Sequence, residues 1–590
     1  MMTLTKSSSN SRSSMPLFKQ FSAKKQQRAK QVSTLLIVLS LNGCISTQKN
    51  TIQPESSAAE TKVEPFSDNS LYALLEAEFS GHRGHFIKAS DIYRQQALAL
   101  DDAELLARAA KLALFNEENP AAEELAYRWL QKQPTNQTAK QLYASSLLQQ
   151  GKLDLALTQM LALYSKGHQQ NFILLAAEAA ETYPDQVPKL LSPMDKATAD
   201  YPDEIQFLLA LGILQTKVDS QIAITTIIRA QQLDPNSIHA VSIEAKILQQ
   251  NGQIDAARQR LKKSIDDGIE NFALRVQYAK LLAQEDIIAG RAYLMGLHQE
   301  QARNVDALYS LALINKQLKL WGDAEDNFKQ LVDLHAHTNE SHYYLGLLAR
   351  RTGDMDGAAA HYQQVGRGDK YLFAVSRLSE MWQTDLPKLQ NYMAQQRSLY
   401  PSEKIELYLI ESETLLIEQN YTLAHQLLSQ GIIENPDNNT LRYSRSLVSD
   451  KRADIKLIEE DLRAILEDRP QHAATLNALG YSLTNYTTRY DEALTLIRKA
   501  LKNKPGDPAI LDSLGWTYYQ QGNVKTALIY LVEAYKRQPD PEIAAHLGEA
   551  LWSQNQKQKA LQIWQQALAS YPGHELIIST MTRLKVITPQ

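Results

Sequence analysis

The sequence predicts an all-α fold, a solenoid of about 15 stacked helical hairpins. The first observation is a glycine column, in which Gly480, Gly515 and Gly548 lie 35 and 33 residues apart. The second is that the same phase runs back to Ala77 in steps of 33 to 35 residues, and 14 of its 15 positions hold Gly, Ala or Ser. The third is that no stretch alternates apolar and polar residues for long enough to suggest a strand. A fixed period of about 34 residues is typical of stacked helical repeats.

Two columns of small residues mark where the two helices of each hairpin cross, because helix axes approach closely only over small side chains. The first column is Ala77, Ala110, Ala144, Glu178, Gly212, Ala245, Ala279, Ala312, Gly346, Ser379, Ser412, Ser446, Gly480, Gly515 and Gly548. The second column, 12 residues further on, includes Ala89, Ala122, Ala156, Ala257, Ala324, Ala358 and Ala424. Only Glu178 breaks the first column.

The unit around Gly515 shows how each hairpin is expected to form. Its first helix carries a stripe at i, i+3, i+4, i+7 spacing, made of Leu511, Leu514, Gly515 and Tyr518. The facing stripe of the second helix is Ala527, Leu531 and Ala534. Gly522 and Asn523 predict the turn between them, and Pro539 predicts the end of the second helix. No hairpin can bury its apolar face alone, so the hairpins are expected to stack.

The residue types at fixed positions of this unit resemble the tetratricopeptide repeat (TPR). Small residues occupy positions 8, 20 and 27 of a 34-residue unit, and Pro occupies position 32. The aromatic residues at position 24 are Tyr93, Phe328, Tyr362 and Trp564. The resemblance implies a right-handed superhelical solenoid of TPR-like hairpins over residues 69–585, with the best-matching repeats at 300–365 and 470–573.

The N-terminal residues 1–43 predict a secretory signal. They contain seven Lys/Arg and no acidic residue, and an apolar run covers residues 32–41. That run is too short to span a bilayer as a stop-transfer helix. The start of translation is left open between Met1 and Met15.

Leu41-Asn42-Gly43-Cys44 resembles the lipobox of bacterial lipoproteins, which implies that Cys44 is acylated and becomes the mature N-terminus. The alternative is a buried or incidental cysteine. By the same resemblance, Ile45 after the cysteine implies a lipid-anchored protein of the outer membrane that faces the periplasm. Residues 44–68 are polar and proline-containing, which predicts a flexible tether.

The composition limits the kinds of partner. Removal of residues 1–43 leaves 55 basic and 66 acidic residues, a net charge near −11, which argues against nucleic-acid binding. One cysteine excludes an internal disulfide.

No catalytic or cofactor motif is found, so the sequence predicts a non-enzyme without cofactor or metal. The chain contains no phosphate-binding loop, no dinucleotide fingerprint and no cysteine pair for zinc. A zinc-protease pattern starting at His574 lacks its second histidine, since Ile578 stands there, and His335 and His337 are expected on different helix faces. Glu411-Ser412 resembles the catalytic pair of lytic transglycosylases, but the serine falls in the small-residue column.

The predicted partner-binding residues lie on the first helices, which line the concave side in repeats of this family. They are Asn477, Tyr481, Asn485, Asp512, Trp516, Tyr519, Gln520, Glu549, Trp552, Tyr343 and Arg350. Large aromatic residues beside polar groups are common at binding hot spots. The alternative for Trp516 and Trp552 is packing on a neighbouring hairpin, whereas Trp564 is predicted to fill the core.

The C-terminal segments "LNALGYSLTNYTTRYDEALTLIRKAL", "DPAILDSLGWTYYQQGN" and "PDPEIAAHLGEALW" resemble a group of TPR lipoproteins of Gram-negative bacteria. This group includes the outer-membrane partner of a periplasmic carboxyl-terminal processing protease. The resemblance implies a non-enzymatic adaptor that binds the protease and delivers peptidoglycan hydrolases to it. The alternatives are an assembly or pilotin lipoprotein for pili, secretins or outer-membrane proteins, and a cell-wall-degrading enzyme that uses Glu411 as the acid.

Overall fold

The computed structural model describes residues 68–116 and 118–586. These residues form 31 α-helices and two short 3-10 helices, and they contain no strand. The predicted signal, the tether up to residue 67 and the acylated Cys44 lie outside the described residues. Among the residues described, no helix is both long and apolar enough to cross a membrane. The described helices divide into two compact units, residues 68–336 and 337–586.

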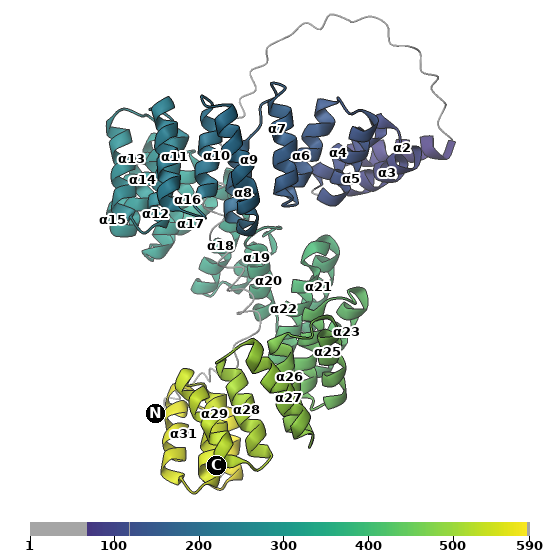
Figure 1. The fold of residues 1–590 in the computed structure, drawn as a ribbon, viewed down its shortest axis with the longest axis vertical. Coiled ribbons are helices and arrows are strands. Elements are labelled where there is room, and N and C mark those ends of the chain that lie inside the picture. Colours follow the sequence, from purple (N-terminus) through teal and green to yellow (C-terminus); the bar gives the residue numbers. More distant parts are fainter. Residues whose placement is uncertain (1–67, 117, 587–590) are drawn as a thin grey trace, which may run out of the picture. The chain divides into compact units, whose positions relative to one another are not determined.

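The first unit contains eight consecutive antiparallel hairpins, whose helices stand side by side in Figure 1. Its helices are α2 (Asp68–His82), α3 (Phe86–Leu100), α4 (Ala103–Phe115), α5 (Asn119–Lys132), α6 (Gln137–Gln149), α7 (Leu153–Tyr164), α8 (Phe172–Glu181), η2 (Pro184–Gln186), α9 (Val187–Asp200), α10 (Ile205–Gln215), α11 (Ser220–Leu233), α12 (Ile238–Gln250), α13 (Ile254–Asp266), α14 (Phe272–Glu285), α15 (Ile287–Glu300), α16 (Val305–Gln317) and α17 (Trp321–Asp333).

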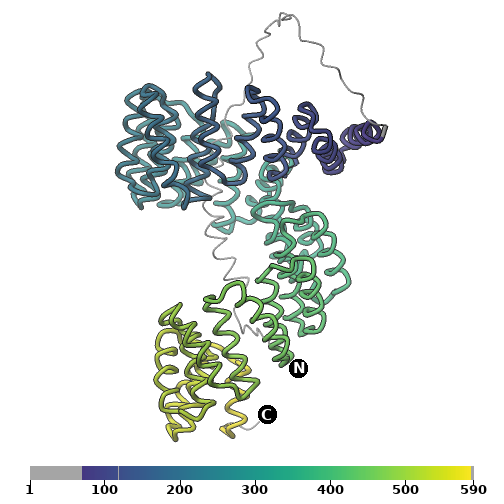
Figure 2. Tube along the Cα trace, turned by 45° about the vertical axis from the view of Figure 1, so that its right-hand side comes forward, coloured from purple at the N-terminus to yellow at the C-terminus, as the bar shows by residue number. Residues whose placement is uncertain are grey.

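The second unit contains seven further hairpins and a final single helix, which Figure 2 shows from green to yellow. Its helices are α18 (Thr338–Thr352), α19 (Met355–Gln363), α20 (Tyr371–Met381), α21 (Leu386–Leu399), η3 (Pro401–Glu403), α22 (Lys404–Ile417), α23 (Tyr421–Glu434), α24 (Asn439–Lys451), α25 (Ile455–Asp468), α26 (Ala473–Tyr486), α27 (Tyr490–Asn503), α28 (Pro508–Gln520), α29 (Val524–Arg537), α30 (Pro541–Ser553), α31 (Lys557–Ser570) and α32 (Glu575–Arg583). The predicted all-α repeat fold is confirmed, and each of the 15 hairpins carries its position of the first column on its first helix, with a small residue in 14 of them.

The glycine column lies at the closest approach between the two helices of a hairpin, as predicted. A Cβ added to Gly515 would come 2.7 Å from Cγ of Leu531 on the second helix. A Cβ added to Gly548 would come 2.1 Å from Nε1 of Trp564. Trp564 is fully buried, so the core-filling role predicted for position 24 is confirmed.

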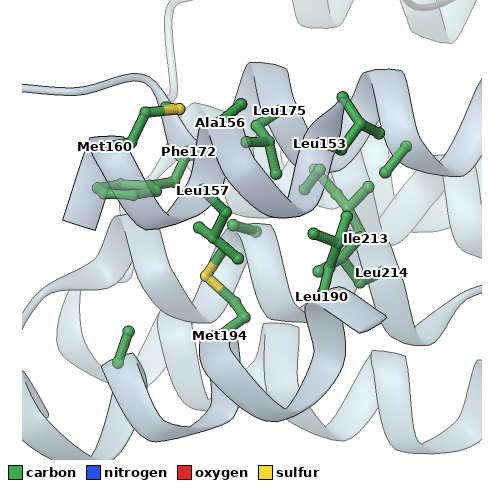
Figure 3. Packing of buried hydrophobic residues seen from close by; sticks show 14 of the residues in the cluster. Leu153, Ala156, Leu157, Met160, Phe172, Leu175, Leu190, Met194, Ile213 and Leu214 are labelled. Carbon is green, nitrogen blue, oxygen red and sulfur yellow. The ribbon is translucent and has the colours of Figure 1, made fainter. Parts of the chain in front are cut away.

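The hairpin that breaks the column, α8 and α9, still joins a continuous core. Glu178 lies on α8, which is only 10 residues long, and α9 contains Pro193 in its interior. Figure 3 shows the apolar side chains that meet here from four consecutive helices, α7 to α10. They include Leu153, Leu157, Met160, Phe172, Leu175, Leu190, Met194, Ile213 and Leu214. The core therefore runs through the irregular hairpin without interruption.

Candidate functional site

The first helices α26, α28 and α30 bring most of the predicted partner-binding residues together. Asp507 caps α28, since its carboxylate accepts hydrogen bonds from the backbone N–H groups of Ala509 and Ile510. Asp540 caps α30 in the same way, and a proline follows each of these caps. The resulting α26–α30 face is defined by Tyr481, Asn485, Asp512, Trp516, Tyr519, His546 and Glu549.

Trp516 is the centre of this face and links three hairpins. Its ring stacks on His546 at 4.1 Å between centroids and on Tyr519 at 5.1 Å, with interplanar angles of 18° and 17°. Its Nε1–H donates a hydrogen bond to Oδ1 of Asn485 on α26 at 2.9 Å. Only 7% of the residue is exposed. Trp516 therefore packs between neighbouring hairpins, which is the alternative that the sequence left open.

A buried ion pair joins α28 to α30 beneath the tryptophan. Nδ1 of His546 lies 2.9 Å from Oδ2 and 3.1 Å from Oδ1 of Asp512, and both side chains are buried. Burial alone would lower the pKa of His546, but the Asp512 carboxylate, together with Glu542 and Glu549, raises it above its ordinary value. The Asp512 carboxylate thus favours the protonated imidazole, whose ring stacks against the face of Trp516.

A second set of contacts fixes the side of the face nearest the C-terminus. Tyr519 donates its hydroxyl to Oε1 of Glu549 at 3.4 Å, and Nη2 of Arg583 lies 2.5 Å from Oε2 of the same carboxylate. Glu549 is buried, whereas Tyr519 remains half-buried. Arg583 on α32 thus holds Glu549, and Glu549 orients Tyr519.

The remaining predicted residues on these helices differ in their surroundings. Asn477 has a buried Oδ1 without a hydrogen-bond partner, and Gln520 is exposed. Trp552 is half-buried, with its ring 5.9 Å from that of Trp564 and Nζ of Lys557 at 5.2 Å. Trp552 therefore packs against the second helix of its own hairpin.

Tyr343 and Arg350 lie in a separate cluster on α18. Nη1 of Arg350 pairs with Oε2 of Glu380 at 2.9 Å. The ring of Tyr343 lies 6.3 Å from Phe373, with Nζ of Lys370 at 5.9 Å from its centre. The structure thus places these two residues on α18–α20, apart from the α26–α30 face.

Sequence reasoning did not select His546 and Arg583, although a signal for both exists. His546 follows its partner Asp512 by 34 residues, and Arg583 follows Glu549 by 34 residues. This interval is one repeat, so each pair occupies equivalent positions on consecutive first helices. A search for opposite charges one period apart finds both.

The proposed acid of the enzymatic alternative is not accessible. Glu411 is 1% exposed and pairs with Nη1 of Arg397 at 2.5 Å. Burial raises the pKa of Glu411 even though Arg397 acts in the opposite sense. The hydroxyl of Ser412 donates to the backbone carbonyl of Leu409 in its own helix. Both residues therefore have structural partners, and among the described residues no cluster of three or more His, Cys, Asp or Glu side chains is placed to hold a metal.

Comparison with known proteins gives the family. A family model described as "Tetratricopeptide repeat" matches residues 317–370 and 513–575. The TPR repeat-containing protein PA4667 of Pseudomonas aeruginosa is 33% identical over 537 residues, which cover 88% of this chain and 90% of that protein. The chain belongs to the tetratricopeptide repeat proteins.

Solved structures similar to this TPR protein include TTC0263, a thermophilic TPR protein of Thermus thermophilus, and the yeast Tom70. The first is 20% identical, covers 30% of this chain and 95% of its own, and has a TM-score of 0.27. The second is 13% identical, covers 87% of this chain and 99% of its own, and also has a TM-score of 0.27. TM-scores this low do not amount to an overall superposition, so nothing about this TPR protein follows from either structure. Its family and its fold make it a scaffold suited to protein–protein interaction.

Proposed function

We propose that this TPR protein is a non-enzymatic adaptor, held in the outer membrane by a lipid on Cys44 and facing the periplasm. It binds a carboxyl-terminal processing protease, or the cell-wall hydrolases that such a protease degrades, and thereby assists regulated proteolysis. The family and the helical-repeat fold support the scaffold part of this proposal. The lipid anchor and the kind of partner rest on the sequence of the signal and of the C-terminal repeats.

The observation that carries the proposal is the rigid construction of the α26–α30 face. Tyr481 and Tyr519 remain half-buried there, while buried side chains from neighbouring hairpins fix their surroundings. Tyrosine loses little conformational freedom on binding and offers an aromatic surface with a polar end. Because the side chains of this face are already ordered, less conformational entropy is lost when a partner binds to it.

A double substitution on this face tests the proposal. In Tyr519→Ala/Gln520→Ala, both altered side chains are partly or fully exposed, so the hairpins should remain folded. Binding of the purified protease or of a peptidoglycan hydrolase to the full chain should weaken at least tenfold. The matched control is Tyr571→Ala, which removes an exposed tyrosine that directly follows α31 and is not part of the α26–α30 face. Equal affinities of wild type and double variant for both proteins would refute the assignment of this face.

The anchor is tested separately. Cys44→Ser should move the protein from the membrane fraction to the soluble periplasmic fraction, since an acyl chain contributes about 0.8 kcal/mol per buried CH₂ group. Confinement to the membrane raises the effective concentration of bound partners without new contacts. Cells with Cys44→Ser should therefore accumulate the hydrolase. Unchanged fractionation of the variant would contradict the lipid anchor, but it would not bear on whether the α26–α30 face binds a partner.

A further inference from the structure

The first helix of the solenoid exposes a stripe of large apolar side chains. Tyr72 and Phe79, seven residues apart on α2, are 71% and 61% exposed. Leu75 lies between them and is 48% exposed, and Leu71 is 49% exposed. These four residues define the N-terminal end face. Isolated exposed apolar residues are normal on protein surfaces, but a contiguous stripe on one helix is a candidate interaction site.

The same positions are buried in most of the later hairpins, although their equivalents in α4, Leu105 and Leu112, are half-buried. Equivalent to Tyr72 and Phe79 are the pairs Ala139 and Ser146, Phe207 and Leu214, Leu274 and Leu281, Ala307 and Ile314, Leu441 and Val448, Ile510 and Thr517, and Ile543 and Ala550, all of them buried. Their neighbours belong to the preceding hairpin. Leu274 and Leu281 pack with Ala257 and Leu261 of α13, for example. What covers this position elsewhere in the chain is therefore the second helix of the hairpin before it.

A solenoid normally ends in a repeat whose outer face is polar, because nothing stacks on it. The N-terminal end face departs from this rule, since α2 keeps the apolar pattern of an internal hairpin. A helix packed on α2 would continue the interface that joins the other hairpins of this unit. The stripe thus has the spacing that receives an amphipathic helix.

An adjoining pocket extends this surface. A cavity of about 490 Å³ lies between α2 and α4 and shares Leu71 and Leu75 with the end face. Its wall includes Glu78, which pairs with Arg108 of α4, and Tyr93, which donates its hydroxyl to Glu78. Glu78 and Arg108 are thus paired with each other, and Leu71, Leu74, Leu75 and Leu105 supply apolar surface to the pocket.

The extent of the face argues against a second copy of this chain as the occupant. With side chains of roughly 200 Å² each, the exposed fractions amount to roughly 450 Å² on one copy. Two copies joined end to end would bury roughly 900 Å², below the roughly 1,200 Å² at which stable interfaces begin. A different protein is free to extend its contact from the face into the pocket. Residues 45–67 of this chain contain Pro54 and Pro65 and few apolar residues, so their composition does not provide an amphipathic helix.

We infer that the N-terminal end face is a docking site for an amphipathic α-helix of a partner protein, which packs on α2 as the second helix of a preceding hairpin would. This site is independent of the α26–α30 face and adds a second point of attachment to the adaptor. The partner helix carries apolar residues at i, i+3 or i+4, and i+7, and places one of them in the pocket between α2 and α4.

Photo-crosslinking in cells tests the site on the full chain in its own membrane. A photoreactive benzoylphenylalanine replaces Tyr72 in one variant and Phe79 in another. The matched control carries it in place of Ile529, an apolar residue of α29 that is 68% exposed. We expect the same polypeptide to be captured at both α2 positions and not at the control, with the cross-link inside a segment of the stated apolar spacing. Binding of that purified polypeptide should weaken at least tenfold in Tyr72→Ser/Phe79→Ser and remain unchanged in Ile529→Ser.

Four outcomes would overturn the inference. These are an adduct of two copies of this chain, adducts with lipid alone, adducts with many proteins that share no amphipathic helix, and a captured protein whose affinity the double serine variant does not change. Folding is checked by circular dichroism, since exposed side chains can be replaced without loss of core contacts. The variant Tyr519→Ala/Gln520→Ala should leave the cross-link intact, so failure of the α26–α30 face and failure of the end face are distinguishable.

Discussion

The substitution His546→Gln tests the buried ion pair that joins α28 to α30. In the wild type, His546 faces Asp512 on α28 and is stacked on Trp516, with Glu542 and Glu549 of its own helix nearby. Glutamine retains a hydrogen-bond donor but carries no charge, so Asp512 would be left buried without a counter-charge. Removing one partner of a buried pair costs about 3–5 kcal/mol. We expect the C-terminal hairpins to lose stability by that amount at pH 6.

The stabilising effect of the ion pair between His546 and Asp512 should decrease as the pH rises. The pKa of His546 is raised on folding, so its stabilising contribution is fully present below the unfolded value of about 6.5 and is lost as the pH rises through the folded value. Each unit by which the folded pKa exceeds the unfolded one corresponds to about 1.4 kcal/mol. The stability of the wild-type hairpins should therefore fall as the pH rises above about 6.5, and His546→Gln should remove this fall.

Hydrogen exchange of the full chain, followed by mass spectrometry, measures the opening free energy of α28–α32 directly. A solenoid opens locally, so this measurement does not require that the whole chain unfold in one step. The control is His239→Gln, which removes an exposed histidine of α12 in the other unit. If wild type and His546→Gln show the same opening free energy between pH 6 and 9, or if wild-type stability rises over that range, the ion pair does not act as argued.

Two further substitutions probe the packing. Gly548→Ala should destabilise the protein by about 1–3 kcal/mol, because its Cβ would lie 2.1 Å from Nε1 of Trp564. Gly322→Ala, at a helical position with open space around it, should stabilise the protein by about 0.5–1 kcal/mol. Thermal melts in which Gly548→Ala is at least as stable as Gly322→Ala would contradict the conclusion that Gly548 lies where two helices approach closely. Trp516→Phe keeps the ring stack but removes the hydrogen bond to Asn485, so it should lower the opening free energy measured by hydrogen exchange by about 1 kcal/mol. An unchanged opening free energy would show that this hydrogen bond does not contribute to stability.

The fold was predictable because its main constraint is local and periodic. At Gly515 and Gly548, an added side chain would meet the second helix of the same hairpin, and a small residue recurs at 14 of the 15 column positions. One hairpin, α8 and α9, departs from the pattern at Glu178, and the sequence column showed that departure as well. The repeat count follows from such positions without knowledge of how hairpins contact one another.

The candidate site was predictable only in part, because its decisive contacts connect consecutive hairpins. The spacing of Trp516 placed it correctly on the face of the first helix, but it could not show that His546 of the next hairpin covers one side of the ring. Position within a repeat gives the direction of a side chain. Whether that side chain stays accessible depends on the residue one repeat further on, which varies from hairpin to hairpin. Gln520, on the same helix as Trp516, is exposed.

Stability and binding are coupled at the C-terminal end through this same inter-hairpin order. Arg583 of α32 holds Glu549, and Glu549 accepts the hydroxyl of Tyr519, so the last helix fixes a residue of the candidate face two first helices away. Ends of a solenoid open most readily because they have a neighbour on one side only. Opening of α32 would release Glu549 as a buried charge without its cation and free Tyr519 from its oriented position. A partner that needs an ordered Tyr519 therefore stabilises the closed end when it binds, by the same free energy that the closed end contributes to its affinity.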